Sequence, residues 1–329
     1  MRQLLVLVWV AACGSSTAPA AAPPPATCPA VASSPVVVAT APASAFASAA
    51  PAVEAPPPPK PPPPPPALVA ALDAVNQAVA AKDWTKADKL LADAQSAAGD
   101  DPHLLHLVAR TRAVRFASAG DFERAASSIV ALIPLLAKHP ELQDEFWAHN
   151  AMMMIREAQG DPAAALAEND QATLAAARGT WDPHGRETLA FQKDRWHRAY
   201  LTRMLAESRA GSAKQALVAY AASALDDYRT RGFPESIAIL DAYFAALDGK
   251  RDAALAAAKR VDPAKDDDIE DLYLVVVGLE AGGDHAGAEA VRRVMRRAEG
   301  VHLARAIMLR WLDLDEKGRG FTPLHATGK

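Results

Sequence analysis

Two histidines, His103 and His106, have a spacing that could bind a metal ion. They lie three residues apart in a segment with helical periodicity, so both imidazoles can project from one face of a helix. A metal site would need a third ligand on that face, and none is visible nearby. We therefore expect exposed helix histidines, no metal site and no cofactor.

A second candidate for chemistry is the stretch Trp181-Asp182-Pro183-His184-Gly185-Arg186-Glu187, which contains the residue types that a hydrolase uses. A capped turn between helices explains its Asp, Pro and Gly without catalysis. The sequence also lacks a phosphate-binding glycine loop, a nucleophile elbow and a zinc-protease helix. We predict no catalytic residues and a protein that is not an enzyme.

The third candidate is Cys13, which follows Arg2 and an apolar run from Leu4 to Ala12. This run is shorter than the roughly 20 residues that span a membrane, and it is typical of a secretory signal. Val10-Ala11-Ala12-Cys13 resembles the lipobox of bacterial lipoproteins, in which an aliphatic residue and two small residues precede the lipidated Cys. The alternative is an ordinary signal with a Cys that follows by chance.

The lipobox resemblance implies a place in the cell. Residues 1–12 would be removed as a signal peptide, and Cys13 would carry the lipid that anchors the chain. Gly14 stands where an Asp would imply retention, so the resemblance implies an outer-membrane anchor and a body that faces the periplasm. Several acyl chains would hold the protein at the membrane, whereas a single chain binds only marginally.

Residues 13–66 form the lipidated Cys and a predicted disordered tether. Residues 14–66 are mainly Ala, Pro, Ser, Thr and Val, with Glu54 and Lys60 as their charges, a composition that cannot bury a core. The proline runs favour extended polyproline II, which suits a spacer or a ligand for an aromatic groove. Cys28 has no partner in the chain if Cys13 is lipidated, so we expect no disulfide framework.

From residue 67 to residue 329 the charged residues return and the apolar residues recur at helical spacing. The formal net charge of −4 gives no reason to expect nucleic acid as a partner. Six segments share one pattern, a turn residue followed five positions later by Ala. The pairs are Lys82 and Ala87, Gly120 and Ala125, Gly160 and Ala165, Gly211 and Ala216, Gly249 and Ala254, and Gly283 and Ala288.

This pattern resembles the tetratricopeptide repeat (TPR), a helical hairpin of about 34 residues. Gly adopts the left-handed conformation that ends the first helix, Asp caps the second helix, and Ala lets the two helices touch. The resemblance implies an all-α, TPR-like α-solenoid of about six hairpins, and a generic α-solenoid is the alternative. We also expect an amphipathic helix over residues 301–315 that caps the last hairpin.

In TPR proteins the first helix of each hairpin lines a concave surface, and counting back from each turn residue gives the positions that would line it here. We predict that these positions bind a peptide. They are Arg110, Asn150, Met154, Glu157, Arg198, Thr202, Tyr243 and Tyr273. The run Met152-Met153-Met154 suits either the core or an adaptable binding surface.

The sequence therefore predicts a lipid-anchored scaffold that binds an unidentified protein or peptide in the groove of a helical-repeat domain. The alternative is a structural envelope protein that binds peptidoglycan or another anionic polymer. Its binding surface would be a basic face made of Arg292, Arg293, Arg296 and Arg297.

Overall fold

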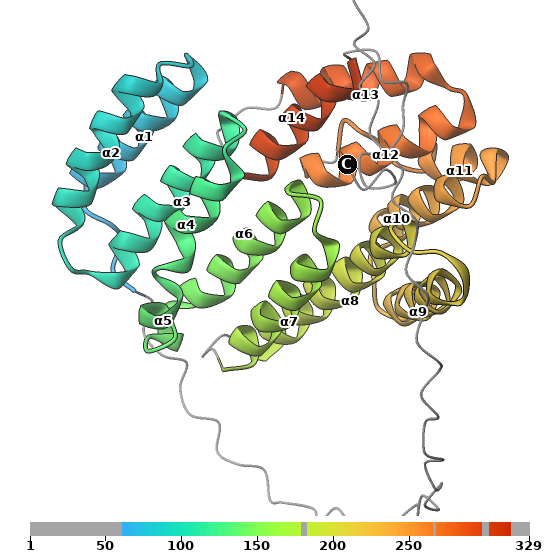
Figure 1. The fold of residues 1–329 in the computed structure, drawn as a ribbon, viewed down its shortest axis with the longest axis horizontal. Coiled ribbons are helices and arrows are strands. Elements are labelled where there is room, and N and C mark those ends of the chain that lie inside the picture. Colours follow the sequence, from blue (N-terminus) through green and yellow to red (C-terminus); the bar gives the residue numbers. More distant parts are fainter. Residues whose placement is uncertain (1–60, 179–182, 266–267, 298–302, 317–329) are drawn as a thin grey trace, which may run out of the picture. The chain divides into compact units, whose positions relative to one another are not determined.

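The computed structural model describes residues 61–178, 183–265, 268–297 and 303–316 (Figure 1). The described chain is helical throughout and contains no strand, so the all-α prediction is confirmed. All of these residues belong to one unit, Ala55–Lys329. The predicted signal peptide, Cys13, Cys28 and residues 13–60 of the predicted tether lie outside the described residues.

The helices pack as consecutive pairs, and we call the members of each pair its first and second helix (Figure 1). The pairs are α1 (Pro66–Ala80) with α2 (Trp84–Ala98), α3 (Pro102–Ser118) with α4 (Phe122–Val130), α6 (Asp144–Ala158) with α7 (Pro162–Arg178), α8 (Pro183–Glu207) with α9 (Gly211–Arg229), α10 (Pro234–Leu247) with α11 (Arg251–Ala258), and α12 (Ile269–Gly282) with α13 (His285–Arg297). The short helix α5 (Ile133–Leu136) and the 3-10 turn η1 (Pro140–Leu142) join the second pair to the third, and α14 (Leu303–Glu316) follows the last pair.

The turns between paired helices have the conformation that the repeat pattern predicts. All six predicted turn residues have a positive φ, from 57° at Lys82 to 85° at Gly283, in the region that Gly adopts most readily. The Asp after the turn caps the second helix where it is present. For example, the Asp121 side chain accepts a hydrogen bond from the Arg124 backbone N–H at 3.1 Å.

The small residue early in the second helix is also buried in five of the six pairs. Ala87, Ala125, Ala165, Ala254 and Ala288 are each 0% exposed. The prediction is wrong for Ala216, which is exposed.

The fourth pair differs in where its second helix begins. Helix α9 begins at Gly211 itself and has no side-chain cap. The missing Asp does not explain this difference, because no Asp follows Gly249 in the fifth pair either and Ala254 is still buried. Its buried residues begin at Ala221, one and a half turns later than the pattern predicts.

The predicted cap over the last hairpin is also corrected. Helix α14 forms, but it packs mainly against α3, and then against α12 and α6, and less against α13 (Figure 1). Its apolar residues Leu303, Ile307, Met308 and Leu312 are buried in the main core. Burying this apolar face in the main core removes it from water, which stabilises the position of α14.

Candidate functional site

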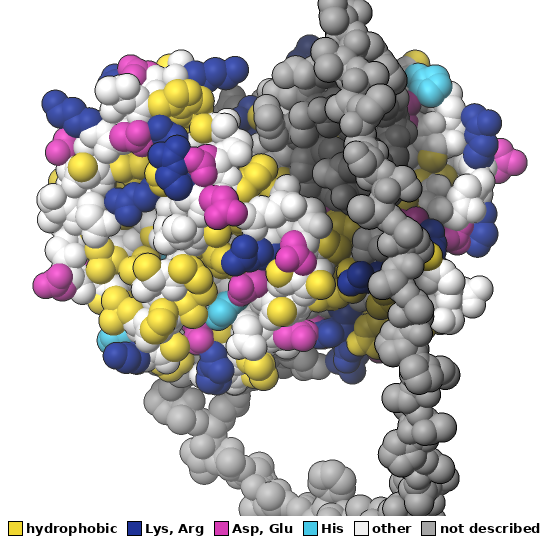
Figure 2. Space-filling model, viewed as in Figure 1, with side chains coloured by type: hydrophobic (Ala, Val, Ile, Leu, Met, Phe, Trp, Pro, Cys, Tyr) yellow, Lys and Arg dark blue, Asp and Glu magenta, His cyan; other side chains and the backbone are white. Residues whose placement is uncertain are grey.

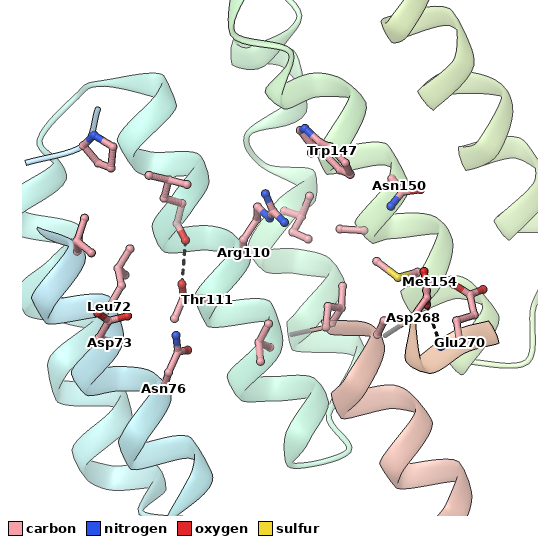
Figure 3. Close-up of a pocket in the computed structure, with 18 residues that line it drawn as sticks. Leu72, Asp73, Asn76, Arg110, Thr111, Trp147, Asn150, Met154, Asp268 and Glu270 are labelled. Carbon is pink, nitrogen blue, oxygen red and sulfur yellow. Dashed lines mark hydrogen bonds between the residues drawn. The ribbon is translucent and has the colours of Figure 1, made fainter. Parts of the chain in front are cut away.

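A pocket of about 470 Å³ opens between α1, α3 and α6 (Figure 3). The first residues of α12 and α14 complete its wall. The lining combines aliphatic side chains and Trp147 with polar groups, a mixture that is typical of ligand sites. The polar groups are Asp73, Asn76, Arg110, Thr111, Asn150, Asp268 and Glu270.

Helix register explains why α3 and α6 direct side chains into this pocket. In α3, the Asp101 carboxylate accepts the His103 backbone N–H at 2.9 Å, and Pro102 occupies the first helical turn. On α6, Trp147, Asn150 and Met154 follow one another at spacings of three and four residues, which place them on one face.

Three of the eight predicted peptide-binding residues line the pocket: Arg110, Asn150 and Met154 (Figure 3). Arg110 is exposed, and its guanidinium carbon lies 5.8 Å from the centre of the Trp147 ring. Asn150 is 8% exposed and Met154 is half-buried. An arginine over an aromatic ring, an amide and a flexible thioether can contact a peptide backbone and its side chains.

The methionine run divides between the two roles considered for it. Met152 and Met153 are each 0% exposed and belong to the main core. Met154 points to the pocket instead. Consecutive residues of a helix face different directions, so one run supplies both the core and the pocket.

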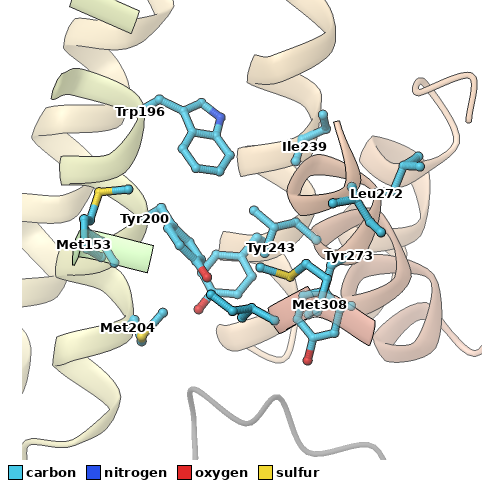
Figure 4. Packing of buried hydrophobic residues seen from close by; sticks show 14 of the residues in the cluster. Met153, Trp196, Tyr200, Met204, Ile239, Tyr243, Leu272, Tyr273 and Met308 are labelled. Atoms are coloured by element: carbon cyan, nitrogen blue, oxygen red, sulfur yellow. The ribbon is translucent and has the colours of Figure 1, made fainter. Parts of the chain in front are cut away.

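Four other predicted residues lie in the interior rather than in a groove. Glu157 is 2% exposed. Thr202, Tyr243 and Tyr273 are each 0% exposed. The Tyr243 ring packs 5.2 Å from the ring of Tyr200, centre to centre (Figure 4). The aromatic side chains of α8, α10 and α12 fill the space that the sequence analysis assigned to a ligand.

Arg198, the remaining predicted residue, links α8 to α7 through ion pairs. Its guanidinium bonds to Asp194 in its own helix and to Asp170 in α7 at 2.8 Å. The Asn169 side chain of α7 also donates to Asp194, at 3.3 Å. Arg198 does not line the pocket that holds Arg110 and Asn150.

A buried acidic pair extends from the wall of the pocket, which Glu270 lines, into the interior. Glu157 and Glu270 are 2% and 5% exposed, and the Tyr200 hydroxyl donates a hydrogen bond to Glu157. Burial raises the pKa of Glu157 well above its usual value, and the charge of Glu270 raises it further. Glu270 also lies 3.9 Å from Nε2 of His197. Glu157 therefore keeps its proton to a higher pH in the folded protein than in the unfolded chain.

The expectation that His103 and His106 are exposed is wrong, because both contact Asp144 at the start of α6. Asp144 lies 2.7 Å from Nδ1 of His103 and 3.0 Å from Nδ1 of His106, whose side chain is only 1% exposed. Burial lowers the pKa of His106, although Asp144 acts in the opposite direction. Burial raises the pKa of Asp144, but the two histidines outweigh it and hold that pKa below its usual value.

This cluster was missed because Asp144 lies 41 residues after His103 in the sequence. Its nearest signal was the i, i+3 spacing of the two histidines, which does not reveal their partner. Among the described residues, no group of three or more His, Cys, Asp or Glu side chains is placed to hold a metal ion. The arrangement is a hydrogen-bonded link between α3 and α6.

The four arginines of α13 do not form one exposed basic face. Arg292 is only 11% exposed and pairs with Glu280 at 2.7 Å. Arg293 and Arg297 are exposed, whereas Arg296 is half-buried. Figure 2 shows positive and negative side chains interspersed over the described part of one face.

No family model matches the chain, and no curated protein or solved structure matches it either. In the described part of the chain, no helix is both long enough and apolar enough to cross a membrane. The stretch Trp181–Glu187 begins outside the described residues, and the side chains of its remainder are not described either.

Proposed function

We propose that this protein is a lipid-anchored, periplasm-facing scaffold that binds a protein or peptide partner with its helical-repeat domain. One observation carries the binding part of the proposal. Arg110 and Asn150, predicted as ligand-binding residues from two different repeats, line one pocket together with Met154. The six turn residues with positive φ and the paired helices support a TPR-like arrangement for the domain.

The test is crosslinking in the native cell envelope, followed by capture of the protein and mass spectrometry. Wild type is compared with a variant that carries Arg110→Ala and Asn150→Ala. The matched control carries Arg293→Ala and Arg297→Ala, which changes two exposed residues of α13. One or two abundant partners that the pocket variant loses and the control keeps would support the proposal.

The same experiment tests the polymer-binding alternative. If only glycan fragments are captured, and the α13 variant loses them, the protein binds an envelope polymer and the proposal is wrong. Strong weakening by salt would agree with that outcome, because salt screens exposed charges.

The anchor is proposed from the sequence and has its own test. Cys13→Ser removes the thiol that the lipid would modify. The variant should appear in the soluble fraction after cell breakage, whereas wild type remains with the outer membrane. A Cys13→Ser protein that stays in the membrane fraction would refute the lipid anchor.

A further inference from the structure

Helix α14 occupies a position that the repeat pattern does not explain. The six helix pairs are complete without it, yet it packs mainly on α3, and then on α12 and α6, and both α3 and α6 lie far earlier in the chain (Figure 1). It packs less against the adjacent helix α13 than against any of these three helices. The helix therefore behaves as an element added to a surface that first helices of several pairs have already formed.

The contact is made by one apolar face of α14. Leu303, Ile307, Met308 and Leu312 follow at spacings of four, one and four residues, and they are between 0% and 8% exposed. Such spacing is how an amphipathic helix binds a groove.

The surface under α14 continues directly into the candidate pocket. Leu303 and Ala304 of α14 form part of the pocket wall, opposite residues of α3 and α6. The apolar side of that wall includes Val114 from α3, and Ala151 and Met154 from α6. Small and flexible apolar residues of this kind suit packing against another helix. Helices α3 and α6 thus line the pocket and, together with α12, hold α14.

We propose that α3, α6 and α12 form a helix-binding groove, that α14 is its resident occupant, and that the partner is an amphipathic helix that takes the place of α14. This inference rests on the proposed function, because it states the shape and chemistry of the partner. The partner helix would carry aliphatic residues or Met at the spacing found in α14.

A tethered occupant has a predictable effect on binding. Because α14 belongs to the same chain, its effective concentration at the groove is on the order of millimolar or higher. An added helix binds only the fraction of molecules from which α14 has left, so its apparent affinity is reduced by that fraction. A variant that weakens the packing of α14 in the groove should therefore strengthen binding of a helix added in trans.

The test uses a fluorescein-labelled synthetic peptide with the sequence of residues 301–316, and fluorescence anisotropy as the readout. The purified proteins are wild type, Ile307→Ala in α14 and Ile239→Ala in α10. Ile307 and Ile239 are 1% and 0% exposed, so the two variants delete the same atoms from the same core. Only Ile307 belongs to α14.

We expect Ile307→Ala to bind the peptide at least tenfold more tightly than wild type, and Ile239→Ala to stay within about threefold of wild type. A peptide that carries Ile307→Ser and Met308→Ser should bind none of the three proteins. Circular dichroism and urea unfolding check that both variants are folded. If Ile307→Ala does not fold, Leu303→Ala replaces it. Leu303 lies at the edge of the buried face of α14 and is 8% exposed.

No peptide binding to the α14 variant, or equal binding to both variants, would mean that α14 is a fixed part of the core and would overturn the inference. That failure is distinguishable from failure of the proposed function. If the Arg110→Ala and Asn150→Ala variant still loses a native partner, the pocket binds a partner that does not replace α14.

Discussion

The first helices near the start of the described chain differ from those near its end in what their corresponding side chains contact. On α3 and α6, Arg110, Asn150 and Met154 border a pocket. On α10 and α12, Tyr243 and Tyr273 are fully buried. The repeat pattern gives these positions equivalent places, so the difference arises from the size of the side chains and from what packs over them.

The comparison shows that a position within a repeat decides the direction of a side chain but not its exposure. Large rings from neighbouring first helices approach one another and exclude solvent, as Tyr200 and Tyr243 do. Where α1, α3 and α6 meet, the space is not filled in this way and a pocket of about 470 Å³ remains. Changes in the buried region should therefore alter stability, and changes at the pocket should alter binding.

The largest effect is expected from Tyr243→Ala in the buried region. Removing a fully buried aromatic ring should lower the free energy of unfolding by about 3–5 kcal/mol, measured by urea unfolding. The control is Tyr220→Ala, because Tyr220 is 53% exposed on α9 and its removal should change stability by about 0.5 kcal/mol or less. Equal small losses from both variants would show that Tyr243 is not part of a packed core.

A smaller loss is expected from Asp144→Asn, which weakens the link from α6 to His103 and His106. Hydrogen bonds to a charged group contribute about 1.5–3 kcal/mol, so the loss at pH 7 should be about 2 kcal/mol. Since the folded pKa of Asp144 is lowered, its contribution is present above the unfolded value of about 3.9 and is lost as the pH falls below it. The deficit of the variant, measured by urea unfolding, should therefore shrink in acid.

The control for this variant is Asp73→Asn, since Asp73 is an exposed carboxylate at the pocket. It should cost about 0.5 kcal/mol or less at every pH. A similar loss from both variants would contradict the special role of Asp144.

Glu157→Gln should change the free energy of unfolding in the opposite direction and stabilise the protein. The folded pKa of Glu157 is raised by burial, so its favourable contribution is complete below the unfolded value and is lost as the pH rises towards the folded value. Gln stays neutral and can still accept the Tyr200 hydroxyl. At pH 8 the variant should be more stable by about 1 kcal/mol or more, the free energy of a tenfold change in proton affinity.

The stability of Glu157→Gln is followed by thermal unfolding from pH 4 to pH 8. The gain should vanish near pH 4, where both side chains are neutral. Glu289→Gln is the control, because the Glu289 side chain is 54% exposed and its change should leave the curve unaltered. A variant that is less stable than wild type at pH 8 would mean that Glu157 is charged in the fold.

The smallest effect on stability is expected from Arg110→Ala at the pocket. Arg110 is exposed and contacts Trp147 through a cation–π interaction, which contributes about 0.5–1 kcal/mol at such sites. Its unfolding curve should nearly overlay that of wild type, while partner capture from the envelope falls. A loss as large as that of Tyr243→Ala would place Arg110 in the buried region instead.

The sequence by itself determined the helical fold and the places of the turns. Gly at the end of a first helix, Asp at the start of a second and a small Ala nearby act within a few residues, so they can be recognised without tertiary structure. The positive φ values and the buried Ala87, Ala125 and Ala165 follow from these local preferences. Ala216 departs from the pattern in the pair whose second helix begins at the turn Gly itself.

Only the tertiary structure decided which first-helix residues meet a pocket and which meet the core. Burial depends on neighbours that are distant in the chain, such as the Tyr200 ring against Tyr243 and Asp144 against His106. The packing of α14 against α3 brings together segments that lie about 200 residues apart in the sequence. Periodicity shows that a helix has an apolar face but not which surface that face will cover, because many surfaces satisfy the same pattern.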